Sequence, residues 1–134
     1  MSTSIHDFHD DPRNAGIKIW LNGQLKPRAE AVVSVFDSGF VLGDGVWEGL
    51  RVVAGQPVFL DAHLDRLFEG AKAIALDIGM ERSELKQAIF DTLTANAMRD
   101  DVHLRLMVTR GVKRTPYQDP RACIGNATVV MIPE

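Results

Sequence analysis

VFDSGFVLGDGVWEGLRVV, residues Val35–Val53, is the stretch that decides the fold of this chain. The pattern predicts a strand that breaks at residues 37–39, a turn at residues 43–45, and a second strand that runs to Val53. Glycines at positions 39, 43, 45 and 49 lie close in sequence to the indole of Trp47, the carboxylate of Glu48 and, two residues after Gly49, the guanidinium group of Arg51. Because glycine allows a positive φ or a close approach to a neighbour, the stretch indicates either an ordinary turn or a backbone shaped around a ligand.

Length and composition limit the protein class. The chain has 134 residues, enough for one domain with its own core, and 46% of them are hydrophobic. The net charge of −3 predicts neither a nucleic-acid nor an anionic-membrane partner. No apolar run approaches the about 20 residues that span a bilayer. The single cysteine, Cys123, excludes an internal disulfide and favours a reducing, cytoplasmic compartment.

The first 16 residues predict a disordered tail. They are polar and acidic, and His6 and His9 lie among three aspartates. Such a cluster has ligands for a metal ion, but a mobile solvated terminus is the favoured interpretation, so no metal site is predicted.

The remaining sequence predicts strands, then two helices, then two strands. Expected strands are Ile17–Leu21, Gln24–Lys26, Ala31–Phe36, Gly49–Val53, Val58–Leu60, His103–Thr109 and Ala127–Ile132; expected helices are one that Asp61 caps, with Gly79 ending either this helix or the turn after it, and one over Arg82–Met98. Asn22-Gly23 predicts a tight hairpin between the first two strands. This order predicts an α+β fold, a mostly antiparallel sheet with helices on one face.

Arginines on ordered elements indicate a site for a small anion. In the expected strand His103–Thr109, Arg105 alternates with leucines, so it faces away from the core. Arg51 and Arg110 lie on strands and Arg66 on a helix. A guanidinium group binds both oxygens of a carboxylate or phosphate at once. The alternative is that each arginine is a solvated surface residue.

Four blocks give the chain a family resemblance: LNGQL, VSVFDSGFVLGDGVWEGLRV, PVFLDAHLDRL and HLRLMVTRG. In this order and spacing they resemble the small N-terminal domain of class IV (fold type IV) pyridoxal-phosphate enzymes. That family includes branched-chain and D-amino-acid aminotransferases and aminodeoxychorismate lyase. The resemblance implies a small domain over residues 17–122, with residues 123–134 as the start of the linker to a second domain.

The resemblance also implies a cofactor, pyridoxal 5'-phosphate, and a set of binding residues. Arg66, in the motif H-x-x-R-L, is implied to bind the cofactor phosphate. Trp47 is implied to line the substrate pocket, Gly49 to keep its wall open, and Arg105 to meet the distal carboxylate of glutamate. The implied substrate-binding set is Phe40, Leu42, Trp47, Gly49, Arg51 and Arg105.

The sequence departs from each branch of the family at particular positions. Branched-chain members have tyrosines where Leu42 and His103 stand, whereas D-amino-acid members have a tyrosine where Arg105 stands. The expected substrates are therefore a branched-chain or a D-amino acid with a 2-oxo acid, and the choice between them stays open.

No catalytic residue is predicted within the chain. The family forms its Schiff base through a lysine of the second domain, and none of the five lysines here lies in that motif. The lysine is expected beyond Glu134, so the chain by itself is expected to be inactive. The resemblance implies a homodimer; an inactive binding or dimerisation module and a lyase-like activity are the alternatives.

Overall fold

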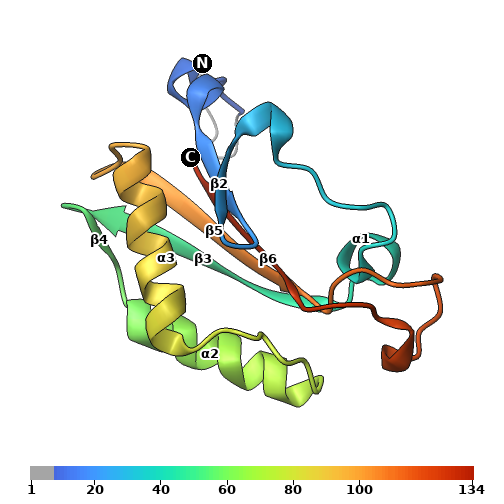
Figure 1. Ribbon diagram of the computed structural model, residues 1–134. Coiled ribbons are helices and arrows are strands. Elements are labelled where there is room, and N and C mark those ends of the chain that lie inside the picture. Colours follow the sequence, from blue (N-terminus) through green and yellow to red (C-terminus); the bar gives the residue numbers. More distant parts are fainter. Residues whose placement is uncertain (1–7) are drawn as a thin grey trace.

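Residues 8–134, which the computed structural model describes, form a six-stranded sheet with helices across one face (Figure 1). The strands are β1 (Lys18–Leu21), β2 (Gln24–Pro27), β3 (Gly45–Val53), β4 (Gln56–Pro57), β5 (Val102–Thr109) and β6 (Thr128–Pro133). They lie in the order β2-β1-β6-β5-β3-β4, and every neighbouring pair is antiparallel. The predicted α+β class is therefore confirmed.

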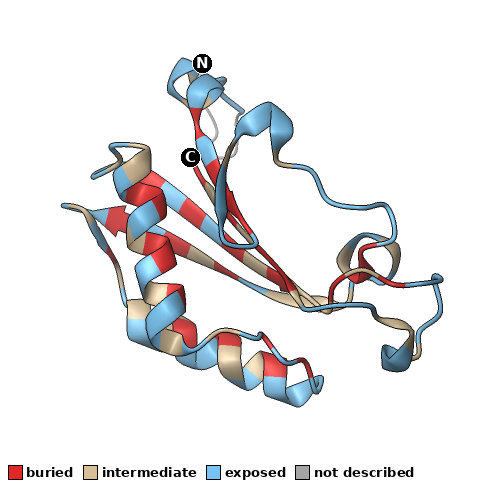
Figure 2. Cartoon of the chain, in the orientation of Figure 1, coloured by how far each residue is buried: buried red, intermediate tan, exposed pale blue. Residues whose placement is uncertain are grey.

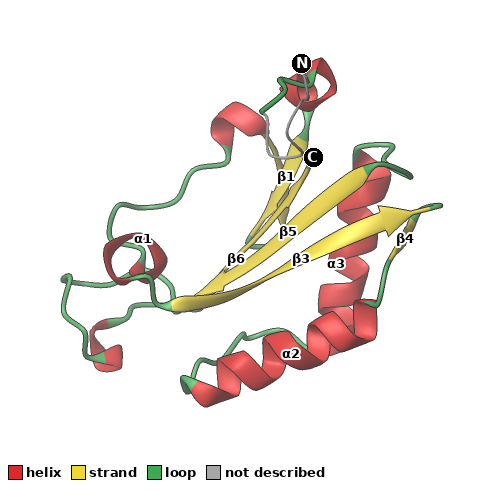
Figure 3. Cartoon of the chain, turned by 180° about the vertical axis from the view of Figure 1, so that it is seen from behind, coloured by secondary structure: helices red, strands yellow, loops and turns green. Residues whose placement is uncertain are grey.

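The α-helices are α1 (Ser38–Leu42), α2 (Leu60–Ala73) and α3 (Arg82–Ala95). Short 3-10 helices η1 (Pro12–Gly16), η2 (Arg28–Glu30) and η3 (Pro120–Ala122) lie in the connections. Figures 1 and 3 show α2 and α3 on the same side of the sheet, as the sequence predicts. No helix in residues 8–134 is long and apolar enough to cross a membrane.

The core lies between the sheet and these two helices. Leu104, Leu106 and Val108 of β5 are fully buried and alternate with more exposed residues, as the sequence predicts. They pack in one cluster with leucines of α2 and α3, among them Leu64 and Leu85. Each fully buried leucine contributes about 1.5–3 kcal/mol to folding. Figure 2 shows the buried residues along the strands and on the inner sides of the helices.

Two hairpins share one turn geometry, and the first of them is the hairpin predicted at Asn22-Gly23. Asn22 and Gly23 have φ of 48° and 90°, and Ala54 and Gly55 have φ of 51° and 76°. Positive φ at both central residues matches the right-handed twist of the flanking strands. The second hairpin ends in β4, which has only two residues.

The expected strand over Ala31–Phe36 is wrong. This segment is irregular and largely exposed, because its β-branched residues have no strand to pair with. The side chain of Asp37 then accepts a hydrogen bond from the N–H of Gly39 at 2.9 Å and caps the start of α1. Gly43, with φ of 64°, caps its end after Leu42. The expected break at residues 37–39 is thus the start of a short helix.

The connection into α2 also differs from the prediction. Val58–Leu60 is not a strand, and Phe59, with φ of 54°, is the residue that precedes the helix. Asp61 is not the cap; it lies in the first turn and pairs with Lys86 at 2.5 Å. α2 ends at Ala73, and Gly79 lies in the turn before α3. α3 ends at Ala95, short of the expected Met98.

Regular secondary structure lies on both sides of each predicted domain boundary. Pro12–Gly16, inside the predicted tail, form η1, which Asp11 caps through a hydrogen bond from the N–H of Arg13. β6 lies within residues 123–134, the predicted linker segment, and pairs with β1 and β5 in the middle of the sheet. The boundaries themselves stay a prediction, and residues 1–7, with His6, lie outside the described residues.

Candidate functional site

A buried carboxylate on β3 organises the site. Glu48 faces the helices, in line with Leu50 and Val52, and only 3% of it is exposed. It accepts hydrogen bonds from Nε and Nη2 of Arg66, at 2.6 and 2.7 Å, and its Oε2 lies 2.7 Å from Nδ1 of His63. The bonds from Arg66 hold the pKa of the Glu48 carboxyl below its usual value, more than burial raises it.

His63 and Arg66 reach this carboxylate from the same face of α2, because residues three apart on a helix are neighbours. No role for Glu48 or His63 is predicted from the sequence. The available signal was the alternation of β3, which places an acid at a core-facing position where a charge needs a partner.

Arg66 keeps one edge of its guanidinium group free. Glu48 occupies the edge formed by Nε and Nη2, which leaves both Nη1 hydrogens and one Nη2 hydrogen available. The Arg66 side chain is 73% exposed. The contact with Glu48 raises the pKa of Arg66, so the group stays a cation. A free, fixed pair of N–H donors is suited to an anion with two oxygens.

This edge opens into a pocket of about 360 Å³ beside β3. It is lined by Val46, Trp47, Glu48, Gly49, Arg66, Leu67 and Gly70, and none of these residues is a lysine. β4 pairs with β3 only at Val52 and Val53, so the first part of β3 has no strand on this side. The structure therefore brings together three of the predicted site residues, Trp47, Gly49 and Arg66.

A second cation lies on the helix-free face of the sheet. This cation is Arg105 of β5, which pairs with Gly49 of β3. Trp47 lies on the same face of β3 as Gly49, and the guanidinium carbon of Arg105 is 4.8 Å from the centroid of the Trp47 ring. This is a cation–π contact. A Cβ on Gly49 would lie 2.7 Å from Nε2 of His103, so glycine here leaves room for that ring.

The other predicted substrate residues lie away from the Arg66 pocket. Phe40 and Leu42 are exposed on α1, which precedes β3. Arg51 is near the end of β3, opposite His103. Neither α1 residue nor Arg51 lines the pocket.

Arg110 has a structural role. It binds Asp44 through Nε at 2.7 Å, and its terminal nitrogens donate to the carbonyls of Ile74 and Ala75 at 2.7 and 2.8 Å. These carbonyls follow the end of α2, where a cation is favourable. Arg110 thus joins β5 to α2, and its exposure is low.

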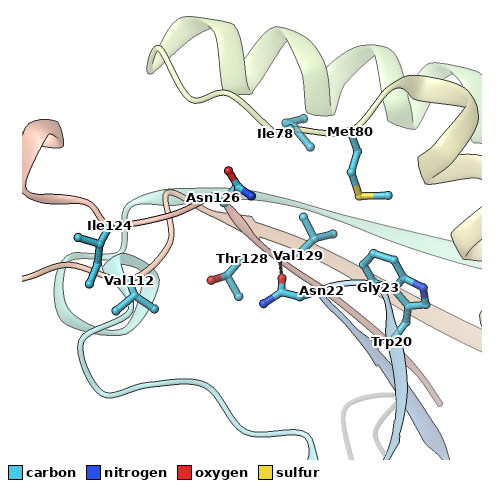
Figure 4. Close-up of a pocket in the computed structure, with 12 residues that line it drawn as sticks. Trp20, Asn22, Gly23, Ile78, Met80, Val112, Ile124, Asn126, Thr128 and Val129 are labelled. Carbon is cyan, nitrogen blue, oxygen red and sulfur yellow. Dashed lines mark hydrogen bonds between the residues drawn. The ribbon is translucent and has the colours of Figure 1, made fainter.

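A larger pocket, of about 520 Å³, lies between the first hairpin and the turn before α3 (Figure 4). Trp20, Ile78 and Met80 line it, and the Asn22 side chain accepts a hydrogen bond from the Val129 N–H at 2.8 Å. Its lining residues include no charged side chain and none of the predicted site residues, so it does not suit an anion. Residues 8–134 contain no group of acids, histidines and cysteine arranged to hold a metal ion.

Comparison with known proteins gives the context of this site. Residues 45–132 match the family Amino-transferase class IV. The chain is 46% identical over 123 residues to branched-chain-amino-acid aminotransferase-like protein 1 of Arabidopsis thaliana, covering 92% of this chain and 22% of that protein. It is 38% identical over 102 residues to a D-alanine aminotransferase of Bacillus licheniformis, covering 76% of this chain and 36% of that protein.

A solved structure has the same fold. The branched-chain aminotransferase from the thermophilic archaeon Thermoproteus uzoniensis, crystallised with norvaline, superposes with a TM-score of 0.74 at 29% identity, covering 88% of this chain and 40% of that one. The chain thus spans well under half the length of these relatives. Another solved branched-chain amino acid aminotransferase of similar fold is complexed with N-(5'-phosphopyridoxyl)-L-glutamate. The family match covers more than half of the chain itself, and this protein belongs to the class IV aminotransferase family.

Proposed function

We propose that this chain is the small domain of a pyridoxal-phosphate-dependent aminotransferase that passes an amino group between an amino acid and a 2-oxo acid. The observation that carries the proposal is the free edge of Arg66, held by Glu48 and exposed beside Trp47. Two phosphate oxygens accept parallel N–H bonds from such an edge, so Arg66 fits the phosphate of pyridoxal 5'-phosphate.

The pocket has room for that group. A Cβ on Gly70 would lie 3.3 Å from Cγ1 of Val46, so glycine at this position lets α2 approach β3 closely at the pocket wall. The chemistry that pyridoxal phosphate supplies when bound is an electron sink beside the substrate amino group. In the proposal Arg66 binds the phosphate, Glu48 fixes the guanidinium plane, and Trp47 forms an apolar wall.

The proposed binding site for the amino-acid substrate lies on the helix-free face of the sheet. Arg105 would bind a substrate carboxylate, and the Trp47 indole would contact an apolar side chain. Phe40, Leu42 and Arg51 stay proposed contacts at the two ends of β3. The similar proteins, one named for branched-chain and one for D-alanine substrates, support a branched-chain or D-amino acid.

We also propose that the protein works as a homodimer in the cytoplasm. Exposed apolar side chains before and within α1, including Val35, Phe36 and Phe40, support an association surface. The single cysteine, Cys123, supports a reducing compartment.

The experiment compares two ligands that differ only in the phosphate. Pyridoxamine 5'-phosphate and pyridoxamine, which have no aldehyde to react with surface lysines, are titrated into the chain and followed by amide and arginine Nε–H NMR shifts. We expect the phosphorylated ligand alone to shift Arg66, Trp47 and Gly49. Equal shifts with both ligands, or none at Arg66, would contradict the proposal.

A further inference from the structure

After β5 the chain forms a loop over residues 112–124, beside α1 (Figure 1, orange to red). Within it Lys113 and Cys123 stand opposite each other in an isolated antiparallel bridge. Two backbone hydrogen bonds of 2.8 Å flank the pair, one on each side. In this arrangement the opposed residues do not bond to each other through their backbones, and their side chains lie close together.

The Lys113 side chain is completely enclosed, with 1% of the residue exposed. Its Nζ lies 3.2 Å from the carbonyl oxygen of Asp119 and 3.6 Å from Sγ of Cys123. A buried lysine normally has a carboxylate partner. Lys113 takes part in none of the ion pairs formed within residues 8–134. The sulfur of Cys123 is therefore its nearest side-chain hydrogen-bond partner.

We propose that Lys113 and Cys123 form a modification site at which oxidation by a peroxide joins the two side chains. The peroxide first transfers one oxygen to Sγ, giving a sulfenic acid and one water. The nitrogen lone pair of Nζ then attacks the sulfur. The S–N bond forms as the S–O bond breaks, and the hydroxyl leaves as a second water with a proton from the amine. One thiol, one amine and one hydrogen peroxide thus become a sulfenamide and two waters.

The site can form this bond because both atoms are already in place. Cys123 is half-buried, which leaves it accessible to a small oxidant, whereas Lys113 is enclosed and has no other covalent partner nearby. The backbone N–H of Lys113 donates to the carbonyl of Phe36 at 2.8 Å, and Asp37 pairs with Val112. The cross-link would therefore tie Cys123, at the far end of the loop, to the residue that is already bonded to the segment before α1.

Mass spectrometry tests the proposal on the 134-residue chain. The chain is treated with hydrogen peroxide, digested with trypsin without reductant, and compared with an untreated sample. We expect the peptides Gly111–Arg114 and Ala122–Glu134 to appear as one species, lighter than their sum by two hydrogen atoms. Dithiothreitol should separate them, because a thiol attacks the oxidised sulfur.

Two variants serve as matched controls. Cys123→Ser removes the sulfur and should give no joined peptide. Lys113→Met keeps an enclosed apolar stem without the amine, and its sulfenic acid should accumulate as a dimedone adduct. In the parent chain dimedone should compete with cross-linking. The proposal is overturned if the parent forms only sulfinic or sulfonic acid at Cys123, or only disulfide-linked dimers.

Discussion

Arg66 and Arg110 each bind a carboxylate through two nitrogen atoms, yet their chemistry differs. Arg110 uses two further donors on the carbonyls of Ile74 and Ala75 and is largely buried, so it holds two elements together. Arg66 keeps its remaining donors exposed. At the scale of single residues, the fraction of donors already occupied separates a structural arginine from one that is available to a ligand.

This difference gives a binding prediction. Arg66→Ala should weaken pyridoxamine 5'-phosphate binding roughly tenfold to a hundredfold, the loss expected for a charge-assisted contact. Arg66→Lys should recover only part of the lost affinity, because an ammonium group lacks the planar pair of N–H donors of a guanidinium group. Arg105→Ala is the control and should leave the affinity nearly unchanged. Calorimetric titration measures all four proteins; an Arg66→Ala affinity equal to that of the parent would make Arg66 a surface residue.

A pH prediction follows from Glu48. Its pKa in the folded chain lies below the ordinary value of 4.5, because Arg66 donates to the carboxylate. The unfolded chain therefore binds more protons between the two values, and the stabilisation is present above about 4.5 and lost as the pH falls through the folded value. Melting curves of the parent and of Glu48→Gln should differ most at neutral pH and converge in acid. If the difference in melting temperature between the two proteins does not change with pH, the ionised Glu48 carboxylate is not its cause.

At the scale of elements, β3 carries the site because its two faces have different neighbours. Glu48 points to α2, while Trp47 and Gly49 face the side without helices. Glycine at position 49 is required by packing, since its φ is not in the left-handed region and the constraint is the nearby His103 ring.

Gly49→Ala should therefore displace the exposed His103 ring and lower the free energy of unfolding by no more than about 1 kcal/mol. Gly16→Ala is the matched control, because a Cβ there meets nothing within 4 Å. Chemical denaturation measures both. Adding His103→Ala to Gly49→Ala should restore most of the loss; if it restores none, the contact with His103 is not the cause.

The elements that the sequence predicted well are those with a periodic pattern. β5 and the helices have one apolar face, and the hairpin at Asn22-Gly23 has a specific turn sequence. The segment before Asp37 has strand-forming residues, but pairing depends on distant partners that local sequence does not reveal. The Glu48–Arg66 contact joins residues 18 apart, so its geometry needed the fold, whereas Arg66 itself was named from its motif.

At the scale of the whole molecule, the 134-residue chain should not transfer amino groups by itself. No lysine lines the Arg66 pocket, and covalent binding of the cofactor aldehyde needs an amine there. Purified chain with pyridoxal phosphate should turn over amino acids no faster than free pyridoxal phosphate. The measurement is 2-oxo acid formation, with heat-denatured chain as control; faster turnover would place a functional amine in this chain.

The exposed apolar surface gives a prediction on association. Large hydrophobic side chains, among them Val35, Phe36, Phe40 and Trp47, are exposed. The chain should therefore bind a hydrophobic dye and self-associate in sedimentation. A variant with Val35→Ser and Phe40→Ser should show weaker dye fluorescence and more monomer. A dye-silent monomeric parent would contradict this prediction.

The position of β3 between two arginines has a consequence for ligand length. Arg66 approaches the strand from the helix side, whereas Arg105 stands on the opposite face. A molecule held by both must pass the strand edge and carry an anionic group at each end. The spacing across one strand then selects among doubly charged ligands by their reach, and a compact anion such as inorganic phosphate satisfies only one arginine at a time.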